Sequence, residues 1–274
     1  MAKENPVIRV KDLVTNFGNH VVHDRLSLDV RRGEVLGLVG GSGSGKSVLL
    51  RTIVGLIHPA GGSVEVFGKR VDALSESEYR ALETRWGVLF QDGALFSSLT
   101  VAQNVQVAMR ERLDLDRGLM DELAALKISM AGLPAETGTL YPAELSGGMR
   151  KRAGLARAMA LDPDILFLDD PTSGLDPISA AAFDDLITRL RATLDCTVFL
   201  VTHDLDTLYA ICDRVAVLGD RKIIAVGTID ELLANDYPWI TEYFSGPRGR
   251  TAQKANRSVE KRQGAVAATS ANSG

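Results

Sequence analysis

The sequence predicts an α/β fold around a mainly parallel sheet, and two patterns indicate it. Four short runs are continuously apolar, as strands buried on both faces of a parallel sheet are: VLGLVG, ILFLDD, TVFLVTH and VAVLG. Helices alternate with them. One is expected from Lys46 to about Leu56, and another begins after Asp176-Pro177, because Asp is a good N-cap and Pro suits the first helical position.

The N-terminal segment predicts a second sheet. VIRVKDLV and VVHDRLSLDV each alternate apolar and polar residues, which is typical of half-exposed strands. The turn FGNH separates them. We therefore expect an antiparallel β flap beside the parallel core.

Between Gln91 and Ala160 the buried-strand pattern gives way to helical spacing. Thr100 and Gln103 form a capping-box pair. Apolar residues then recur three and four positions apart in two sets: Leu119, Leu123, Leu126 and Met130, and then Met149, Ala153, Ala156 and Ala160. This spacing predicts an inserted helical subdomain.

The length of 274 residues fits one folded unit with elaborations, which we place at 1–247. Its parts are a core at about 5–91 and 161–235, the helical subdomain at about 92–160 and a C-terminal extension at about 236–247. Residues 248–274 carry six basic residues and one acidic residue in a run rich in Ala, Ser, Gly, Asn and Gln. That composition predicts a disordered basic tail.

Composition also narrows the function classes. The formal net charge of -4 argues against nucleic acid as the principal ligand. No apolar run approaches the roughly 20 residues of a membrane-spanning helix, and the N-terminus lacks the apolar stretch of a secretory signal. We therefore expect the chain in the cytosol. Cys196 and Cys212 show no metal-binding spacing with the histidines.

The segment GGSGSGKS fits G-x-x-x-x-G-K-[ST] between a predicted strand and a predicted helix. There the backbone amides wrap phosphates, Lys46 supplies a positive charge and the Ser47 hydroxyl can ligate Mg²⁺. The alternative is a Gly/Ser-rich turn that binds no ligand. The predicted strand before the motif and the predicted helix after it favour a phosphate loop. The motif predicts a P-loop NTPase core of the RecA-like type. Its predicted ATP-binding residues are Gly40, Gly41, Ser42, Gly43, Ser44, Gly45, Lys46, Ser47 and Val48.

A second motif, ILFLDD, is a buried strand that ends in two carboxylates. A strand that delivers Asp169 beside Ser47 can hold Mg²⁺, and the next acid, Asp170, can orient the attacking water. A strand-end Asp is more often a turn residue or a helix cap. These two acids indicate a Mg²⁺ and water site because the same chain also carries the phosphate loop.

The stretch ELSGGMRKRAGLARAMALDPDILFLDDPTSGLDP resembles the ABC ATPases. Leu145, Ser146, Gly147, Gly148 and Met149 are similar to the family's LSGGQ signature, with Met in the last place. A helix start attracts phosphate, yet this chain already has a phosphate loop. The resemblance implies that the signature closes on ATP bound by a second copy, in a head-to-tail dimer.

The resemblance covers about residues 5–245 and implies further roles. Gln91 is similar to the Q-loop glutamine that senses Mg²⁺, and His203 to the switch histidine that contacts the γ-phosphate. Ser173 to Asp176 resembles the D-loop that crosses between subunits, so Asp176 joins the predicted ATP site. Phe17 resembles the aromatic that stacks on adenine, with core packing as the alternative.

Asp170 departs from the family, which usually has Glu at this place. Its carboxylate should sit about 1.5 Å further from the water, because Asp is one methylene shorter. This either slows hydrolysis or is offset by a backbone shift. The implied catalytic set is Lys46, Gln91, Asp170 and His203, and the implied Mg²⁺ ligands are Ser47, Gln91 and Asp169.

Within the family, segments such as LFQDGALFSSLTVAQNV look most like the Mce/Mla-type ATPases of bacterial lipid transport, and DYPWITEYFSGPRG is similar to their C-terminal extension. The resemblance implies a permease partner, a Mce-domain lipid-binding protein and a STAS-domain regulator at the cytoplasmic side of the inner membrane. For Trp239, Tyr243 and Phe244, packing on their own domain and contact with a second subunit both stay open. Arg150, Lys151, Arg152 and Arg157 either solvate their helix or face the partner's phosphates.

Three alternatives remain. An ABC transporter for another solute or an exporter shares every catalytic residue, so only the permease-facing and C-terminal segments discriminate. A non-transport ABC ATPase acting on DNA or ribosomes predicts coiled-coil or zinc insertions, two ATPase halves or a strongly basic face, and the sequence has none of these. A regulatory subunit that binds ATP without hydrolysing it is the third.

Overall fold

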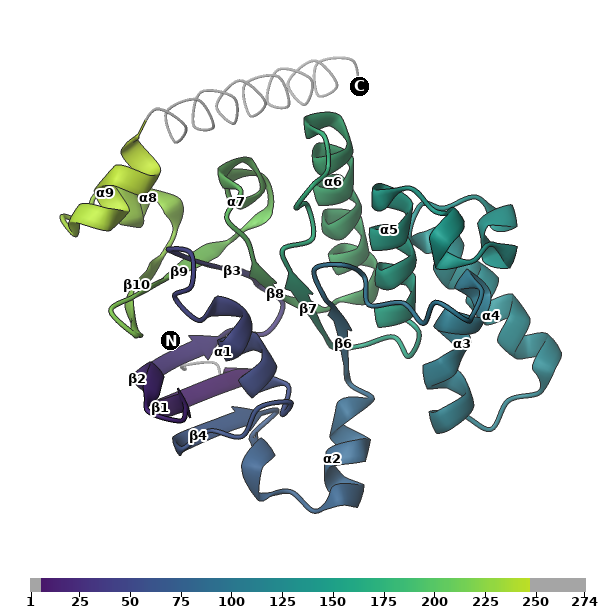
Figure 1. The fold of residues 1–274 in the computed structure, drawn as a ribbon, viewed down its shortest axis with the longest axis horizontal. Helices are drawn as coiled ribbons and strands as arrows, with labels where there is room; N and C mark the ends of the chain where they lie inside the picture. Colours follow the sequence, from purple (N-terminus) through teal and green to yellow (C-terminus); the bar gives the residue numbers. More distant parts are fainter. Residues whose placement is uncertain (1–5, 247–274) are drawn as a thin grey trace, which may run out of the picture.

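The protein is described by a computed structural model that covers residues 6–246 (Figure 1). The expected basic tail at 248–274 lies outside the described residues. Within 6–246, no helix is both long enough and apolar enough to cross a membrane.

A six-stranded sheet forms the centre of the molecule, with the order β10-β9-β3-β8-β7-β6. Its strands are β3 (Val35–Gly40), β6 (Trp86–Leu89), β7 (Ile165–Asp169), β8 (Thr197–Val201), β9 (Arg214–Gly219) and β10 (Lys222–Gly227). The first five are parallel, as their buried apolar runs predict. The edge strand β10 is antiparallel to β9, and none of the four apolar runs predicted it.

The predicted flap is present and larger than expected. β1 (Ile8–Phe17) and β2 (His20–Val30) pair antiparallel, and β4 (Gly61–Val66) and β5 (Lys69–Arg70) extend them into a sheet of order β2-β1-β4-β5. A turn of 3-10 helix (Val71–Ala73) and α2 (Glu76–Glu83) then lead back to β6. Figure 1 shows this sheet on the far side of α1 from the parallel sheet.

The stretch 92–160 forms helices and 3-10 turns without a strand, and Figure 1 shows them gathered at one end of the molecule. They are α3 (Val101–Arg112), α4 (Arg117–Met130), two 3-10 turns (Ala135–Thr139 and Pro142–Glu144) and α5 (Gly147–Ala158). The capping box predicted at Thr100 is present, and Thr228 and Glu231 form another.

Helix α4 forms where the apolar spacing predicts a helix, but not every apolar residue of that spacing is buried. Leu119 and Leu126 are exposed, and the buried positions are Ala124, Lys127 and Ile128. The buried Lys127 side chain contacts the carboxylate of Asp162, which is 64% exposed. Apolar spacing alone does not reveal that a lysine lies on the inner face of this helix.

The remaining helices cover the parallel sheet. They are α1 (Lys46–Ile53), α6 (Pro177–Leu194), α7 (Leu205–Ile211), α8 (Ile229–Leu233) and α9 (Pro238–Ser245). Helix α1 ends before the expected Leu56. Gly55 adopts a left-handed φ of 79°, and a Cβ there would lie 2.8 Å from the Tyr79 ring.

Three apolar clusters hold these layers together. One joins the parallel sheet to α6 and the helices of 92–160. A second joins the opposite face of that sheet to α1 and the flap. The third unites α7, α8 and α9 with β9. The parallel sheet is therefore covered on both faces, as buried strands require.

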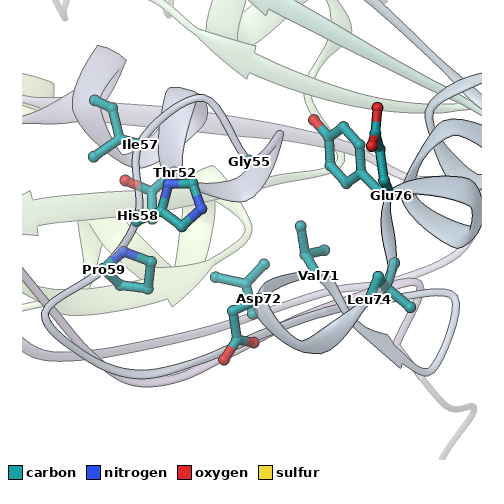
Figure 2. A pocket seen from close by; sticks show the side chains of 11 residues that line it. Thr52, Gly55, Ile57, His58, Pro59, Val71, Asp72, Leu74 and Glu76 are labelled. Atoms are coloured by element: carbon teal, nitrogen blue, oxygen red, sulfur yellow. The ribbon is translucent and has the colours of Figure 1, made fainter.

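A cavity of about 340 Å³ lies between the end of α1, β4 and α2 (Figure 2). Val71 and Leu74 form part of its lining, and His58, Asp72 and Glu76 supply polar groups. It lies on the flap side of the core.

Asp184 generates a testable prediction about stability. Its side chain is buried on α6, accepts a hydrogen bond from Thr207 Oγ1 at 2.9 Å, and burial raises its pKa to about 7. A carboxyl whose pKa is raised by folding binds more protons in the folded state, so it lowers stability as pH rises from about 4 to 7. Asp184→Asn should therefore raise the free energy of unfolding by about 2–4 kcal/mol at pH 8 and by little at pH 4.

Urea unfolding of both proteins at pH 4, 6 and 8 measures this difference. An equal stability difference at all three values would contradict the raised pKa.

Candidate nucleotide site

The phosphate loop connects β3 to α1 at the carboxyl edge of the parallel sheet. Gly41, Ser42 and Gly43 are exposed, and Gly43 and Gly45 have left-handed φ values of 73° and 104°. At Gly45, a Cβ would lie 2.5 Å from Val22 and 2.7 Å from His23. Glycine is required there by both the backbone angle and the close approach of β2.

Two polar groups in the loop suit an anionic ligand. Lys46 Nζ donates to the carbonyls of Gly40 (2.9 Å) and Gly41 (3.0 Å), and burial lowers its pKa. Ser44 Oγ is buried and has no hydrogen-bond partner among the described residues. An ammonium group and an unpaired hydroxyl beside exposed glycines match the needs of bound phosphate.

The second motif meets the first as predicted. Ser47 Oγ donates to Asp169 Oδ1 at 2.8 Å, although the two residues are 122 positions apart. Asp169 is buried, and burial raises its pKa, while the Ser47 hydrogen bond opposes the rise. Among the described residues no group of three or more His, Cys, Asp and Glu side chains surrounds a metal position. A hydroxyl and one carboxylate fit Mg²⁺ that takes its other ligands from phosphate and water.

Asp170 and His203 face each other next to this pair. Nδ1 of His203 lies 3.0 Å from Oδ1 of Asp170, an atom that is buried and makes no aligned hydrogen bond among residues 6–246. Asp170 has a left-handed φ of 52°, a region that Asp tolerates better than most residues. The His203 side chain is 68% exposed, so it is free to meet a ligand.

The remaining predicted residues lie on different elements. Gln91 is exposed just beyond β6, the strand next to β7, and Val48 is half-buried in the first turn of α1. Phe17 ends β1 and is 53% exposed, so it does not pack in the core. Asp176 caps α6, where its Oδ1 accepts from the backbone of Ile178 and Ser179. That capping role was predicted; its contact with ATP stays a prediction.

The signature residues lie at the start of α5, away from α1 in Figure 1. Ser146 is the N-cap, and its Oγ accepts from Met149 N at 3.2 Å. A Cβ at Gly147 would meet nothing within 4 Å, and one at Gly148 would make only an ordinary contact with Leu175 at 3.6 Å. The fold of the single chain therefore does not require glycine at either position.

Three of the four cations near the signature donate to backbone carbonyls of their own chain and so do not simply solvate their helix. Lys151 donates to the carbonyl of Asp170 at 3.1 Å, and Arg152 to that of Ala131 at 3.1 Å. Arg157 donates to Ala94 (2.5 Å) and to Gly93 (3.1 Å). Only Arg150 is exposed. These side chains fasten α5 to the carbonyls of neighbouring loops.

Two more supporting residues escaped the sequence analysis. Asn104, fully buried in α3, donates to the carbonyls of Phe96 and Leu99 and so shapes the loop after Gln91. His23 in β2 is fully buried under the phosphate loop, with Nε2 3.2 Å from the Gly45 carbonyl. Because a carbonyl only accepts, Nε2 carries the proton. For both residues, the sequence signal for a supporting role was a polar side chain on an otherwise apolar face of a helix or strand.

Comparison with known proteins identifies the family. The family model described as "ABC transporter" matches residues 23–173, more than half of the chain. The chain belongs to the ABC transporter family. Its predicted fold class is confirmed: the ATP-binding cassette MJ0796 "bound to ADP and Pi" matches with a TM-score of 0.75 and 27% identity over 81% of this chain and 98% of that one.

Curated relatives agree with the finer resemblance. MlaF of Haemophilus influenzae, an "intermembrane phospholipid transport system ATP-binding protein", is 38% identical over 88% of this chain and 90% of its own. The protein mkl of Mycobacterium leprae, named "Probable ribonucleotide transport ATP-binding protein", is 37% identical over 88% of this chain and 69% of its own. The chain is thus an ATP-binding, ATP-hydrolysing subunit of the ABC transporter type.

His23 provides a prediction for this site. Burial lowers its pKa to about 4, with the Gly45 hydrogen bond as a smaller opposing cause. A histidine with a lowered pKa stabilises the fold above pH 6.5, and that contribution, about 3 kcal/mol, is lost as pH falls to about 4. Because Gln donates a similar hydrogen bond but does not titrate, His23→Gln should keep its stability over this range.

Thermal unfolding of both proteins at pH 4.0 to 7.5 measures the effect. Asp184 titrates in both proteins, so only the difference between them is compared. If the melting temperatures of the two proteins fell equally with pH, the lowered pKa of His23 would be contradicted.

Proposed function

We propose that this chain is the ATPase subunit of a bacterial transporter that moves phospholipid or a related lipid through a separate permease. The observation that carries the proposal is the similarity to MlaF over 88% of this chain and 90% of that protein. The ATPase subunit acts at the cytoplasmic side of the inner membrane, where it is bound to the permease.

A second candidate follows from the other relative. The name of mkl refers to ribonucleotide transport, so a transporter for another solute uses the same ATPase parts. The cargo is decided by the permease, because the ATP-binding residues are common to both candidates.

The site residues divide into three roles. Lys46 and the backbone of residues 40–48 bind the phosphates, and Phe17 stacks on adenine with its exposed ring. Ser47, Asp169 and Gln91 hold Mg²⁺, which neutralises phosphate charge when bound. Asp170 orients the attacking water, and His203 contacts the γ-phosphate from beside it.

A second copy of the chain completes the site. The signature residues Ser146, Gly147, Gly148 and Met149 start a helix whose free amides suit a phosphate, on an element remote from the chain's own phosphate loop. The two glycines leave space that the single chain does not use. A related cassette, MJ0796, is described as dimeric.

The permease contacts the groove beside the loop that follows Gln91. This groove, about 260 Å³, lies between β6, α3 and α5, and the exposed Phe96 lines it. Arg157 also lines the groove and binds the loop carbonyls, so a partner docked here touches the loop that carries Gln91. A Mce-domain protein and a STAS-domain regulator are the further partners expected for the lipid-transport candidate.

The role of Asp170 can be tested directly. Asp170→Asn keeps the shape of the side chain but removes the charge that orients water, so turnover should fall at least about 100-fold while ATP affinity stays within about twofold. Asp170→Glu is the matched control, because it keeps the charge. Unchanged turnover of Asp170→Asn in the native membrane complex would refute the assignment.

The cargo class can be tested by mass spectrometry of proteins that co-purify with the chain from detergent-solubilised native membranes. A permease recovered together with a lipid-binding Mce-domain protein is the expected result. A solute-type permease favours the second candidate, and the absence of any membrane partner contradicts both.

A further inference from the structure

We propose that Tyr243, in the C-terminal helix α9, is a positioning residue for ATP hydrolysis because it holds the loop that carries His203. The inference rests on the role proposed for His203 and adds to it a residue outside the family's nucleotide-binding motifs.

Helix α9 is firmly anchored on the ATPase core. Ile240 and Phe244 are fully buried and pack in one cluster with Leu205 and Leu208 of α7, the helix that follows His203. Figure 1 shows α8 and α9 beside the β9 and β10 edge of the parallel sheet. Of the two possibilities open for the C-terminal aromatic residues, packing on their own domain is the one observed.

The Tyr243 ring has a fixed position. It stacks on Trp239 with ring centroids 4.7 Å apart and an interplanar angle of 12°, and it meets Phe244 edge-on at 5.1 Å. Such aromatic pairs are geometrically specific, and two anchored neighbours leave the ring little freedom. The hydroxyl at its end is therefore placed by the helix.

That hydroxyl contacts the loop between β8 and α7, residues 202–204, which carries His203 and is called the switch loop below. Tyr243 Oη donates to the carbonyl of His203 at 3.1 Å, across 40 positions of the chain. Burial raises the pKa of Tyr243, and the charges of Asp204 and Asp170 raise it further, so the phenol keeps the proton that it donates.

The two ends of the switch loop are held by other hydrogen bonds. Thr202 N donates to Leu38 O at 3.3 Å, and Asp204 Oδ1 accepts from Asp206 N at 3.0 Å as the N-cap of α7. Between them, the Tyr243 hydroxyl is the side-chain donor that holds the His203 carbonyl. The His203 side chain is mostly exposed, so packing does not fix it. A shift of the His203 carbonyl would change the 3.0 Å distance between its Nδ1 and Asp170 Oδ1, because the ring is carried on the same backbone.

Tyr243→Phe removes only the hydroxyl and keeps the stack on Trp239. In the full chain within its membrane complex, we expect kcat for ATP to fall about fivefold, with KM for ATP unchanged and Tm lowered no more than in the control below. Tyr237→Phe is the matched control, because Tyr237 caps the start of the same helix and its exposed hydroxyl donates to Asp220 at 2.5 Å, away from His203 in the chain. The control should keep full kcat.

A spectroscopic readout separates positioning from general stability. The chain has four histidines, so ring resonances of histidine-labelled full-length protein can be assigned by substitution, with His203→Gln identifying His203. Tyr243→Phe should shift the His203 resonance, and Tyr237→Phe should not. An unmoved His203 resonance overturns the proposal, as does a loss of kcat accompanied by an equal loss in Tyr237→Phe.

The two levels of inference fail differently. If His203→Gln abolishes turnover but Tyr243→Phe retains full kcat, the role of Tyr243 is wrong and the proposed function stands. If His203→Gln itself retains full turnover, the role proposed for His203 is wrong, and the inference about Tyr243 falls with it.

Discussion

The hydrogen bond from Ser47 to Asp169 fixes the geometry on which the nucleotide site depends. It joins the helix after β3 to the end of β7, two strands separated in the sheet only by β8. Parallel pairing brings the carboxyl ends of all three strands to one edge, so the phosphate loop, the acidic pair and the switch loop arrive together. A slip of one residue in β7 would turn Asp169 to the opposite face of the sheet.

Carbonyl groups captured by side-chain donors hold the loops around this edge. Lys46 donates to a carbonyl of the phosphate loop, and Lys151 donates to the Asp170 carbonyl. Arg157 donates to a carbonyl of the loop after Gln91, and Tyr243 donates to a carbonyl of the switch loop. Each donor belongs to a helix packed on the sheet, so loop positions follow from helix packing. Burial lowers the pKa of Lys46 and of Lys151, which is the electrostatic cost of placing these ammonium groups there.

Much of this was predictable from the sequence because local patterns determine it. The apolar runs predicted the parallel strands, and the glycine pattern predicted the phosphate loop. Contacts between segments that are far apart in the sequence were harder to predict. The apolar spacing of α4 did not show that Lys127 would be buried while Leu126 is exposed, and a polar His23 in an apolar strand did not reveal that β2 lies under Gly45. Tyr243 was noted as an aromatic, but its partner is 40 residues away.

In the proposed dimer, a second copy of the chain completes the ATP site through the signature glycines. Light scattering of Asp170→Asn with ATP tests this most directly. We expect the mass of two 29.5 kDa chains with ATP and of one chain without it. Adding Gly147→Asp, a side chain that the single chain can accommodate, should keep the protein folded but monomeric. An ATP-bound protein that stays monomeric without the second substitution, or a dimer that is indifferent to it, would contradict the claim.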